Sequence, residues 1–294
     1  MKKILLLLAL VIVAFSGCVE EKPSPEELKT MMIESVEKVE TVAVAVDSDQ
    51  TIKVVNHSET NRTLRTMSFE TKSVGEGELN VTARAMKMTM TTTTSSEDMG
   101  EVVQEMEMYM QGDTMYTKID GNWTKLPGMP EDMWDQQNQV KTQAELLNAS
   151  EIKLEGSEKI NGEDAYKVKV VPDMETFTMI LNQQMGSMPI QNMDITEIFN
   201  DSEMEWTTWI SKESHLPLKN LVAMELTLTS DMMGLPVGEM GDVEMEIKSD
   251  STVIYSNYNE PVVIVVPEEA KNAPNWLDML LGMMAQPSDM PTAK

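Results

Sequence analysis

Methionine carries most of the unusual chemistry available to this chain. The 294 residues include 29 methionines but only 4 phenylalanines, 5 tryptophans and 5 tyrosines. Many of the methionines alternate with other residues, and in a strand such alternation puts every second side chain on one face. The residues expected to share such faces are Met86, Met88, Met90, Met106, Met108, Met110, Met224, Leu226 and Leu228. The sequence therefore predicts thioether-rich stripes on the strands of a sheet.

These stripes fit three kinds of chemistry, which the sequence leaves open. They can be ordinary core, with methionine used in place of leucine and phenylalanine. They can line a deformable cavity, because unbranched thioethers repack around apolar ligands of varied shape. They can also bind Cu(I), for which thioethers are suitable ligands. If they line a cavity, we expect Trp276, Leu280 and Met284, on an amphipathic C-terminal segment, to complete the lining.

Other reactive residues form no catalytic or metal-binding pattern. His57 and His215 have no partners arranged as a catalytic triad or nucleophile elbow. The segment Asp47-Ser48-Asp49 resembles the start of a calcium loop, but the glycine and the final glutamate of that loop are missing. The sequence has no Walker A loop and no dinucleotide fingerprint after a strand. We therefore expect no catalytic residue, no metal site of these residue types, no cofactor and no enzymatic activity.

The charge balance excludes one class of partner. The chain has 23 lysines and arginines against 49 acidic residues, which gives a net charge of −26 and a pI near 4.3. A surface this acidic repels phosphate backbones, so nucleic acid is not an expected partner. With 41% hydrophobic and 24% charged residues, the composition is that of a folded chain rather than a disordered one.

The N-terminus has the pattern of a targeting signal followed by a lipid attachment site. Two lysines precede an apolar run that is too short to span a bilayer, and residues 1–17 fit a signal peptide. Small residues then precede Cys18, the only cysteine, at the place where a lipobox has its acylated residue. We expect residues 18–23 to form a lipidated tether. The mature protein would then be extracytoplasmic, anchored to the outer face of the cytoplasmic membrane as part of the cell envelope.

Asn-x-Ser/Thr sequons give a second indication of an exterior location. The sequence has six, a modest excess over chance for its composition. They are either sites of N-glycosylation or accidents of a threonine-rich strand protein. Together with the lipobox they indicate an archaeal envelope protein. The candidate asparagines are Asn56, Asn61, Asn80, Asn122, Asn148 and Asn200.

Local patterns predict many strands and a few helices. Ser24 followed by Pro25 and Glu27 is the start of a capped helix. Further helices are expected at about 131–147, 174–184 and 275–285, and a loop or lid at 186–201. The strands are expected at about 41–46 and 51–56, joined by a turn at 47–50, then at 62–73, 77–92, 101–111, 114–119, 123–126, 151–160, 163–171, 203–212, 217–230, 242–255 and 261–266.

This order of elements predicts an α+β fold built on an antiparallel sheet. No stretch is rich enough in proline, glycine or charge to divide the mature chain. We therefore expect a single domain over residues 24–285 and a flexible tail at 286–294.

Several segments, in their order along the chain, resemble one family. Tyr-x-Lys and Trp-x-Lys patterns alternate a ring with a charge on hairpin strands, and a Leu-Pro pair starts a long strand. The segments are Gly112–Thr117, Gly121–Lys125, Gly162–Val168, Trp209–Glu213, Leu216–Lys219, Tyr255–Asn259 and Val263–Pro267. Their order over nearly the whole mature chain resembles the LolA/LolB-like and LppX/LprG-like envelope lipoproteins.

The resemblance implies a strongly curved antiparallel sheet, an unclosed half-barrel, with helices covering its concave face. It also implies that the space between sheet and helices holds a lipid acyl chain or another hydrophobic ligand. The expected partners are thus a hydrophobic ligand and, through the anchor, the membrane, while a protein partner stays unknown. Two alternatives remain: a non-catalytic envelope protein with a filled core, and a protein that handles Cu(I) through methionine.

Overall fold

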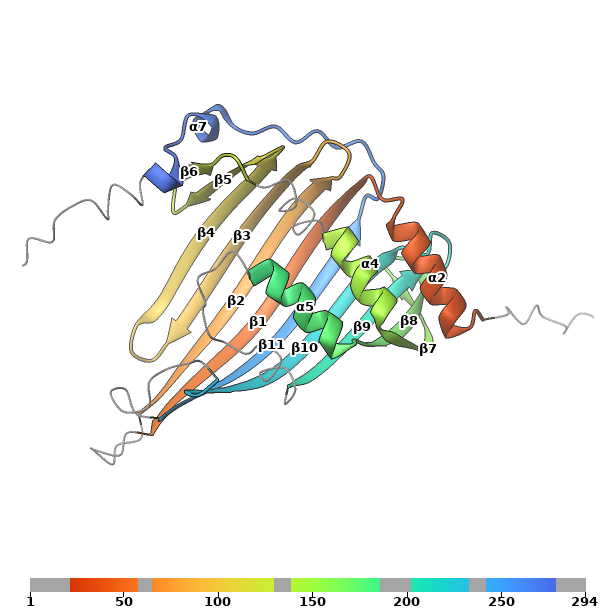
Figure 1. Ribbon diagram of the computed structural model, residues 1–294, viewed down its shortest axis with the longest axis horizontal. Coiled ribbons are helices and arrows are strands. Elements are labelled where there is room, and N and C mark those ends of the chain that lie inside the picture. Colours follow the sequence, from red (N-terminus) through yellow and green to blue (C-terminus); the bar gives the residue numbers. More distant parts are fainter. Residues whose placement is uncertain (1–21, 58–64, 130–138, 186–201, 233–241, 279–294) are drawn as a thin grey trace, which may run out of the picture.

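The fold is an open antiparallel sheet of eleven strands with helices on one face (Figure 1). It is known from a computed structural model that describes the chain except for residues 1–21, 58–64, 130–138, 186–201, 233–241 and 279–294. The strand order is β6-β5-β4-β3-β2-β1-β11-β10-β9-β8-β7. The end strands β6 and β7 do not pair with each other, so the sheet is an unclosed half-barrel, and the predicted fold class is confirmed.

Every pair of neighbouring strands is antiparallel, and most strands are long. The strands are β1 (Thr41–His57), β2 (Arg65–Asn80), β3 (Ala85–Ser96), β4 (Gly100–Gln111), β5 (Thr114–Ile119), β6 (Asn122–Leu126), β7 (Glu151–Ile160), β8 (Glu163–Val171), β9 (Glu203–Ser211), β10 (Pro217–Thr229) and β11 (Asp242–Ser256).

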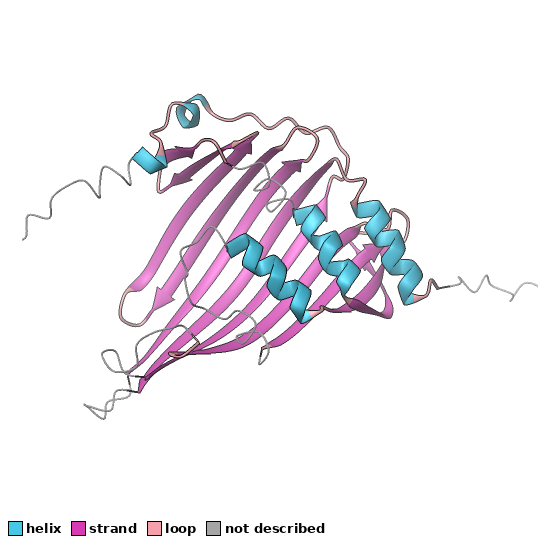
Figure 2. Cartoon of the chain, in the orientation of Figure 1, coloured by secondary structure: helices cyan, strands magenta, loops and turns pink. Residues whose placement is uncertain are grey.

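Three helices lie on one face of the sheet, over the half formed by β1 and β7 to β11 (Figure 2). They are α2 (Pro25–Val36), α4 (Gln139–Ala149) and α5 (Met174–Met185). Leu28 and Met32 of α2 and Leu147 of α4 are fully buried against β7, β8 and β9. Met174 and Phe177 of α5 pack against the far ends of β10 and β11. We call the helix-covered face the inner face and the opposite one the outer face.

The start of α2 follows the predicted capping pattern. The Ser24 hydroxyl accepts a hydrogen bond from the Glu27 backbone N–H at 3.3 Å, and the Glu27 carboxylate accepts one from the Ser24 N–H at 2.9 Å. This reciprocal pair satisfies two N–H groups that the helix itself leaves unpaired. The same bonds hold the pKa of the Glu27 carboxyl below its usual value.

The predicted turn at 47–50 is wrong, because β1 continues without a break from Thr41 to His57. Cross-strand contacts on both faces hold this polar segment extended. On the outer face, Lys72 lies 3.5 Å from Asp47 and 3.7 Å from Asp49. On the inner face, the hydroxyls of Ser48 and Ser251 are 2.7 Å apart. Local turn preference is thus overridden by pairing with β2 and β11.

The predicted gap between strands at 74–76 is also wrong. β2 runs through that segment to Asn80, and the chain turns at residues 81–84 instead. In this turn the Asn80 side chain accepts a hydrogen bond from the Ala83 N–H at 2.8 Å, and Arg84 has a φ of +46°. Asn80 and the left-handed backbone of Arg84 therefore form a turn inside the segment 77–92, which was predicted to be one continuous strand.

Other boundaries agree with the predictions. The hairpins β5–β6 and β7–β8 lie where expected, and Asn161 and Gly162 both have positive φ in the β7–β8 turn. The described part of the second predicted helix, α4, begins at Gln139. Of the predicted helix at 275–285, the structure describes only residues up to 278.

The C-terminal segment does not add the strand predicted at 261–266. It runs extended across the outer face and leads to α7 (Glu268–Lys271), beside β5 and β6 (Figure 1). Ile264 and Val266 are buried there in a cluster with Ala85, Tyr109 and Ala270. The alternate side chains of Val263 and Val265 are exposed. Residues 261–266, which we call the C-terminal strap, therefore pack against the sheet without pairing as a strand.

Candidate ligand-binding face of the sheet

The inner face is free of charge over most of the sheet. Asp, Glu, Lys and Arg are absent from the inner-face positions of β1 to β4 and β8 to β11 that lie in register with β1 residues Val42 to Val54. In a chain of net charge −26, the strand charges thus lie on the outer face, where pairs such as Lys53 and Glu246 meet at 3.1 Å.

The predicted methionine stripes lie together on this inner face. The register places Met86 opposite Met110, Met88 opposite Met108, and Met90 opposite Met106. The three pairs are successive cross-strand partners of β3 and β4, which is the contact geometry that stabilises neighbouring strands. The sequence predicted each stripe, and the pairing of the two stripes is a finding of the structure.

The three pairs differ in burial along the strands. Met86 and Met110 are 7% and 1% exposed and belong to a packed cluster with Val36, Val42 and Leu79. The other four methionines are only half-buried, although they lie on the same face. Among the described helices, none lies over the inner face of β3 and β4 (Figure 1). One end of the methionine zone is therefore core, and the other end is open to contact.

Two glycines of β2 lie beside the open methionines. Gly75 is the cross-strand partner of Met90, and Gly77 is the partner of Met88. A Cβ atom at Gly75 would come within 2.7 Å of the Thr89 backbone oxygen, and one at Gly77 within 2.9 Å of the Lys87 oxygen. Glycine thus allows the close approach and bending of β2 and β3, and it leaves this part of the inner face without side chains.

Met224, Leu226 and Leu228 share the inner face but lie in a separate apolar zone. They pack with Met245, Ile247 and the first turn of α5, toward the opposite ends of the strands from Met86 and Met110. Trp276 is 47% exposed and follows Asn275, which bridges to Lys125 of edge strand β6. Leu280 and Met284 lie outside the described residues. The predicted lining is therefore spread over two zones of the inner face and one edge.

A band of uncharged polar side chains separates the two apolar zones. It occupies two adjacent cross-strand rows, and all of its members are half-buried. Hydroxyl pairs within it meet at 2.7 Å for Ser48 and Ser251, and at 3.1 Å for Ser73 and Thr92. We call this set the polar band: Ser48, Gln50, Thr71, Ser73, Thr92, Thr94, Ser249 and Ser251.

Three buried polar residues continue this polarity under the helices, and sequence reasoning missed them. Trp206, Thr208 and Asn220 are 4%, 0% and 6% exposed and lie on the inner face of β9 and β10. Within the part of the chain that the structure describes, the Trp206 Nε1, Thr208 Oγ1 and Asn220 Oδ1 atoms have no hydrogen-bond partner. In the sequence, the only signal for these residues is the alternation of side chains along a strand, which puts Trp206 and Trp209 on opposite faces.

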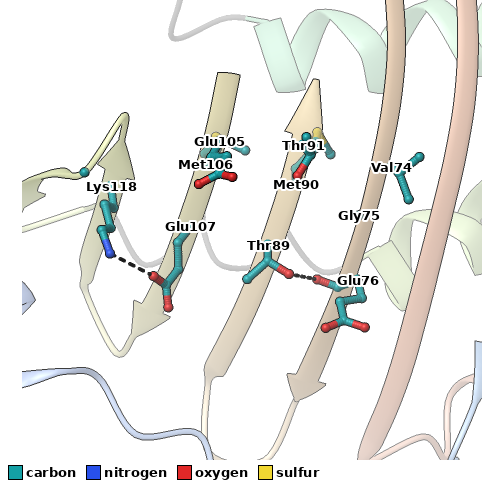
Figure 3. A pocket seen from close by; sticks show the side chains of 11 residues that line it. Val74, Gly75, Glu76, Thr89, Met90, Thr91, Glu105, Met106, Glu107 and Lys118 are labelled. Atoms are coloured by element: carbon teal, nitrogen blue, oxygen red, sulfur yellow. Dashed lines mark hydrogen bonds and ion pairs between the residues drawn. The ribbon is translucent and has the colours of Figure 1, made fainter. Parts of the chain in front are cut away.

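Two recesses lie on the part of the sheet formed by β2 to β5, and both mix polar with apolar lining residues. One, of about 460 Å³, lies across β2 to β5, and Figure 3 shows Glu107, Lys118 and Thr89 around it. Its charged residues belong to the outer face, where Lys118 Nζ lies 3.7 Å from a Glu107 oxygen. The other, of about 820 Å³, lies at the β3–β4 hairpin tip, beside Phe69 and Met99. Met90 and Met106 of the predicted lining are among the residues around the first recess, and none of the predicted lining residues that the structure describes borders the second.

Two tyrosines have strongly perturbed acidity. The Tyr258 hydroxyl donates a hydrogen bond to the Pro217 carbonyl at 2.7 Å, and burial raises its pKa well above the ordinary value. Burial also raises the pKa of Tyr109 to about 12, and its hydroxyl donates to the Glu107 carboxylate at 2.8 Å. Both side chains therefore stay neutral at physiological pH and serve as hydrogen-bond donors.

Several other predicted features can be placed. Among the described residues, no group of three or more His, Cys, Asp or Glu is placed to hold a metal ion. None of the helices in the described ranges is long and apolar enough to cross a membrane. Cys18, Asn61 and Asn200 lie outside the described residues. Asn122 and Asn148 are exposed, whereas the Asn80 amide donates to the Val262 carbonyl at 3.1 Å.

Fold and site together define an open half-barrel with an uncharged inner face and a charged outer face. The chain belongs to a family described as a family of unknown function, DUF6612, whose model matches residues 24–275. No curated protein matches the chain.

Several solved structures match most of this chain, with low sequence identity and low TM-scores. The lipoprotein LppX of Mycobacterium tuberculosis has 14% identity and a TM-score of 0.39, and covers 82% of this chain and 100% of its own. LprF of Mycobacterium bovis has 15% identity and a TM-score of 0.41, with 83% and 98% covered. An outer membrane lipoprotein-sorting protein domain from Vibrio parahaemolyticus has 8% identity and a TM-score of 0.24, with 82% and 95% covered. These are proteins of the kinds that the sequence resemblance named.

Proposed function

We propose that this protein is a lipid-anchored, extracytoplasmic envelope protein that binds a hydrophobic ligand on its inner face. The observation that carries the proposal is the set of half-buried methionines Met88, Met90, Met106 and Met108, on a face without charge. Apolar side chains left open on one uncharged face indicate a surface that another apolar body covers.

The chemistry of this surface suits a ligand of variable shape. Thioether side chains are unbranched and polarizable, so they adapt to different apolar contours. Gly75 and Gly77 add no side chains of their own beside these methionines. Because the candidate surface consists of methionine, glycine and uncharged polar side chains, the role we propose for it is binding or carriage rather than catalysis.

The anchor would hold this face near a membrane. If Cys18 is acylated, only six residues separate it from the start of α2 at Pro25. An extended segment of that length spans about 20 Å. The helix-covered half of the inner face would then lie close to the lipid surface from which a ligand could be taken.

Dye binding with matched methionine variants tests the proposal. The mature chain is titrated with the neutral dye Nile red, and native mass spectrometry of gently purified protein records any retained lipid. Replacing Met88 and Met108 together by glutamine keeps length but adds polarity, and we expect dye affinity to fall about tenfold. Met99→Gln, at a turn position that is 63% exposed, is the control and should change nothing.

Absence of dye binding and of retained lipid would refute the proposal. It would leave the filled-core alternative, an envelope protein that acts through protein contacts.

Cu(I) handling is a second candidate, favoured by one observation. Three thioether pairs face each other on β3 and β4, at the spacing of direct cross-strand partners. Thioether sulfur is a soft ligand that suits Cu(I). Titration with Cu(I) against a competing chelator tests this candidate. An affinity no better than that of free methionine would eliminate it.

A further inference from the structure

The polar band and the buried trio of Trp206, Thr208 and Asn220 carry information about the ligand itself. Trp206 lies in the same cross-strand row as Ser251 and Ser48, and Asn220 lies in the next row. The polar surface therefore extends across β3, β2, β1 and β11. On β10 the two band rows hold Val222 and Met224, and polar residues resume one row away at Asn220 and Thr208, beneath the helices. The polar surface divides the inner face into an apolar zone at each end of the strands.

This surface offers both donors and acceptors. In a hydroxyl pair such as Ser48 and Ser251, one O–H donates to the other, and the second O–H remains available. Trp206 Nε1 can only donate, Asn220 Oδ1 can only accept, and Thr208 Oγ1 can do both. Buried polar atoms of folded proteins nearly always have a partner, so three of them close together on one face indicate a bound molecule that supplies it.

The surface offers no partner for a charged group. The inner-face positions in register with Val42 to Val54 carry no lysine or arginine. Phosphate and carboxylate groups depend on such cations, or on several N–H donors, when they leave water. An ester or ether oxygen and a hydroxyl need only single, neutral hydrogen bonds. The polar band and the buried trio supply those.

We infer, resting on the proposed function, that the ligand is an uncharged lipid with hydroxyl and ester or ether groups between its apolar chains. Its chains would lie along the methionine zone and the Leu226–Leu228 zone. Its polar middle would lie against the polar band and the buried trio.

Three probes of similar apolar size test the inference by displacement of Nile red from the mature chain. Dioleoylglycerol has the inferred chemistry, dioleoyl phosphatidic acid adds a charge, and squalane has no polar group. Dioleoylglycerol is expected to bind about tenfold more tightly than either of the others. Each tenfold step corresponds to about 1.4 kcal/mol.

Strand β3 provides a matched pair of variants. Thr92 and Thr94 belong to the polar band, whereas the alternate residues Thr91 and Thr93 lie on the outer face. Changing Thr92 and Thr94 to valine removes two hydroxyls at constant shape and should weaken dioleoylglycerol binding three- to tenfold, without effect on squalane. The same change at Thr91 and Thr93 should alter neither.

Tryptophan variants test the buried trio separately. Trp206→Phe removes the unpaired N–H and should also weaken dioleoylglycerol binding. Trp209→Phe, on the outer face, where Nε1 donates to Glu158 at 3.1 Å, is its control. Thermal unfolding of each variant shows whether the fold is retained.

The outcomes separate this inference from the proposed function. Equal affinity for dioleoylglycerol and squalane, or tighter binding of the phosphatidic acid, overturns the inference and leaves the proposed function standing. Unchanged binding in both the Thr92/Thr94 variant and Trp206→Phe also overturns it, and means that water alone pairs these atoms. Failure of all three probes, and of the dye, to bind refutes the proposed function as well.

Discussion

Truncation of two methionines on one strand separates packed core from open surface. Met110 is 1% exposed in a closely packed cluster, whereas Met106, four residues earlier on the same face of β4, is half-buried. Met110→Ala should destabilise the protein by about 2–5 kcal/mol, because it removes three buried atoms and leaves a cavity. That is a large part of the roughly 5–15 kcal/mol by which folded domains are stable.

The contrast is measured by thermal unfolding of the mature chain. For a domain of this size, each kcal/mol lowers Tm by about 2–4 °C, so Met110→Ala should lower Tm by about 4–20 °C. Met106→Ala should cost less than about 1 kcal/mol but weaken Nile red binding, since its side chain contributes to the open surface. An equal loss of stability in both variants, with dye binding unchanged, would show that Met106 is also packed core and would refute the reasoning.

Three further predictions concern the backbone, alkaline pH and the C-terminal strap. Gly75→Ala should cost about 1–3 kcal/mol in urea unfolding, because its Cβ would lie 2.7 Å from a backbone oxygen of β3; an unchanged midpoint contradicts this. The raised pKa values of Tyr109 and Tyr258 mean that the native state favours the neutral phenols, so their contribution is complete below about pH 10 and is lost as pH rises toward 12. Unfolding free energies should therefore fall between pH 10 and 12, less steeply in Tyr258→Phe, and a flat profile would be evidence against both shifts. Val266→Ala, at a 2% exposed position, should cost about 1.5–3 kcal/mol, whereas Val265→Ala, 67% exposed, should stay within about 0.5 kcal/mol; equal effects would mean that the strap does not pack as described.

The features that could be predicted from sequence are those with a local cause. The Asn161-Gly162 turn and the Ser24 cap were found because each depends on residues within a few positions. The methionine stripes were found because alternation in a strand follows from backbone geometry. The continuity of β1 through Asp47 and Asp49 was missed, because partners more than twenty residues away hold that segment extended.

The candidate site was only partly predictable for the same reason. The absence of charge on the inner face becomes visible only when strands β1 to β4 and β8 to β11 are in register. The zone of Leu226 and the zone of Met110 look alike in sequence, yet they lie at opposite ends of the strands. The spacing of three between Trp206 and Trp209 puts them on opposite faces of a strand, but only the structure shows that Trp206 lies on the inner face.

The most direct test of the central claim is to map where an apolar ligand contacts the sheet. Dioleoylglycerol carrying a diazirine in its acyl chain is irradiated with the folded mature chain, and the cross-linked residues are located by mass spectrometry. Binding to the inner face predicts cross-links at Met88, Met90, Met106 and Met108, and few at the alternate residues of the same strands. Cross-links confined to outer-face residues, or no more than in the unfolded chain, would contradict the account.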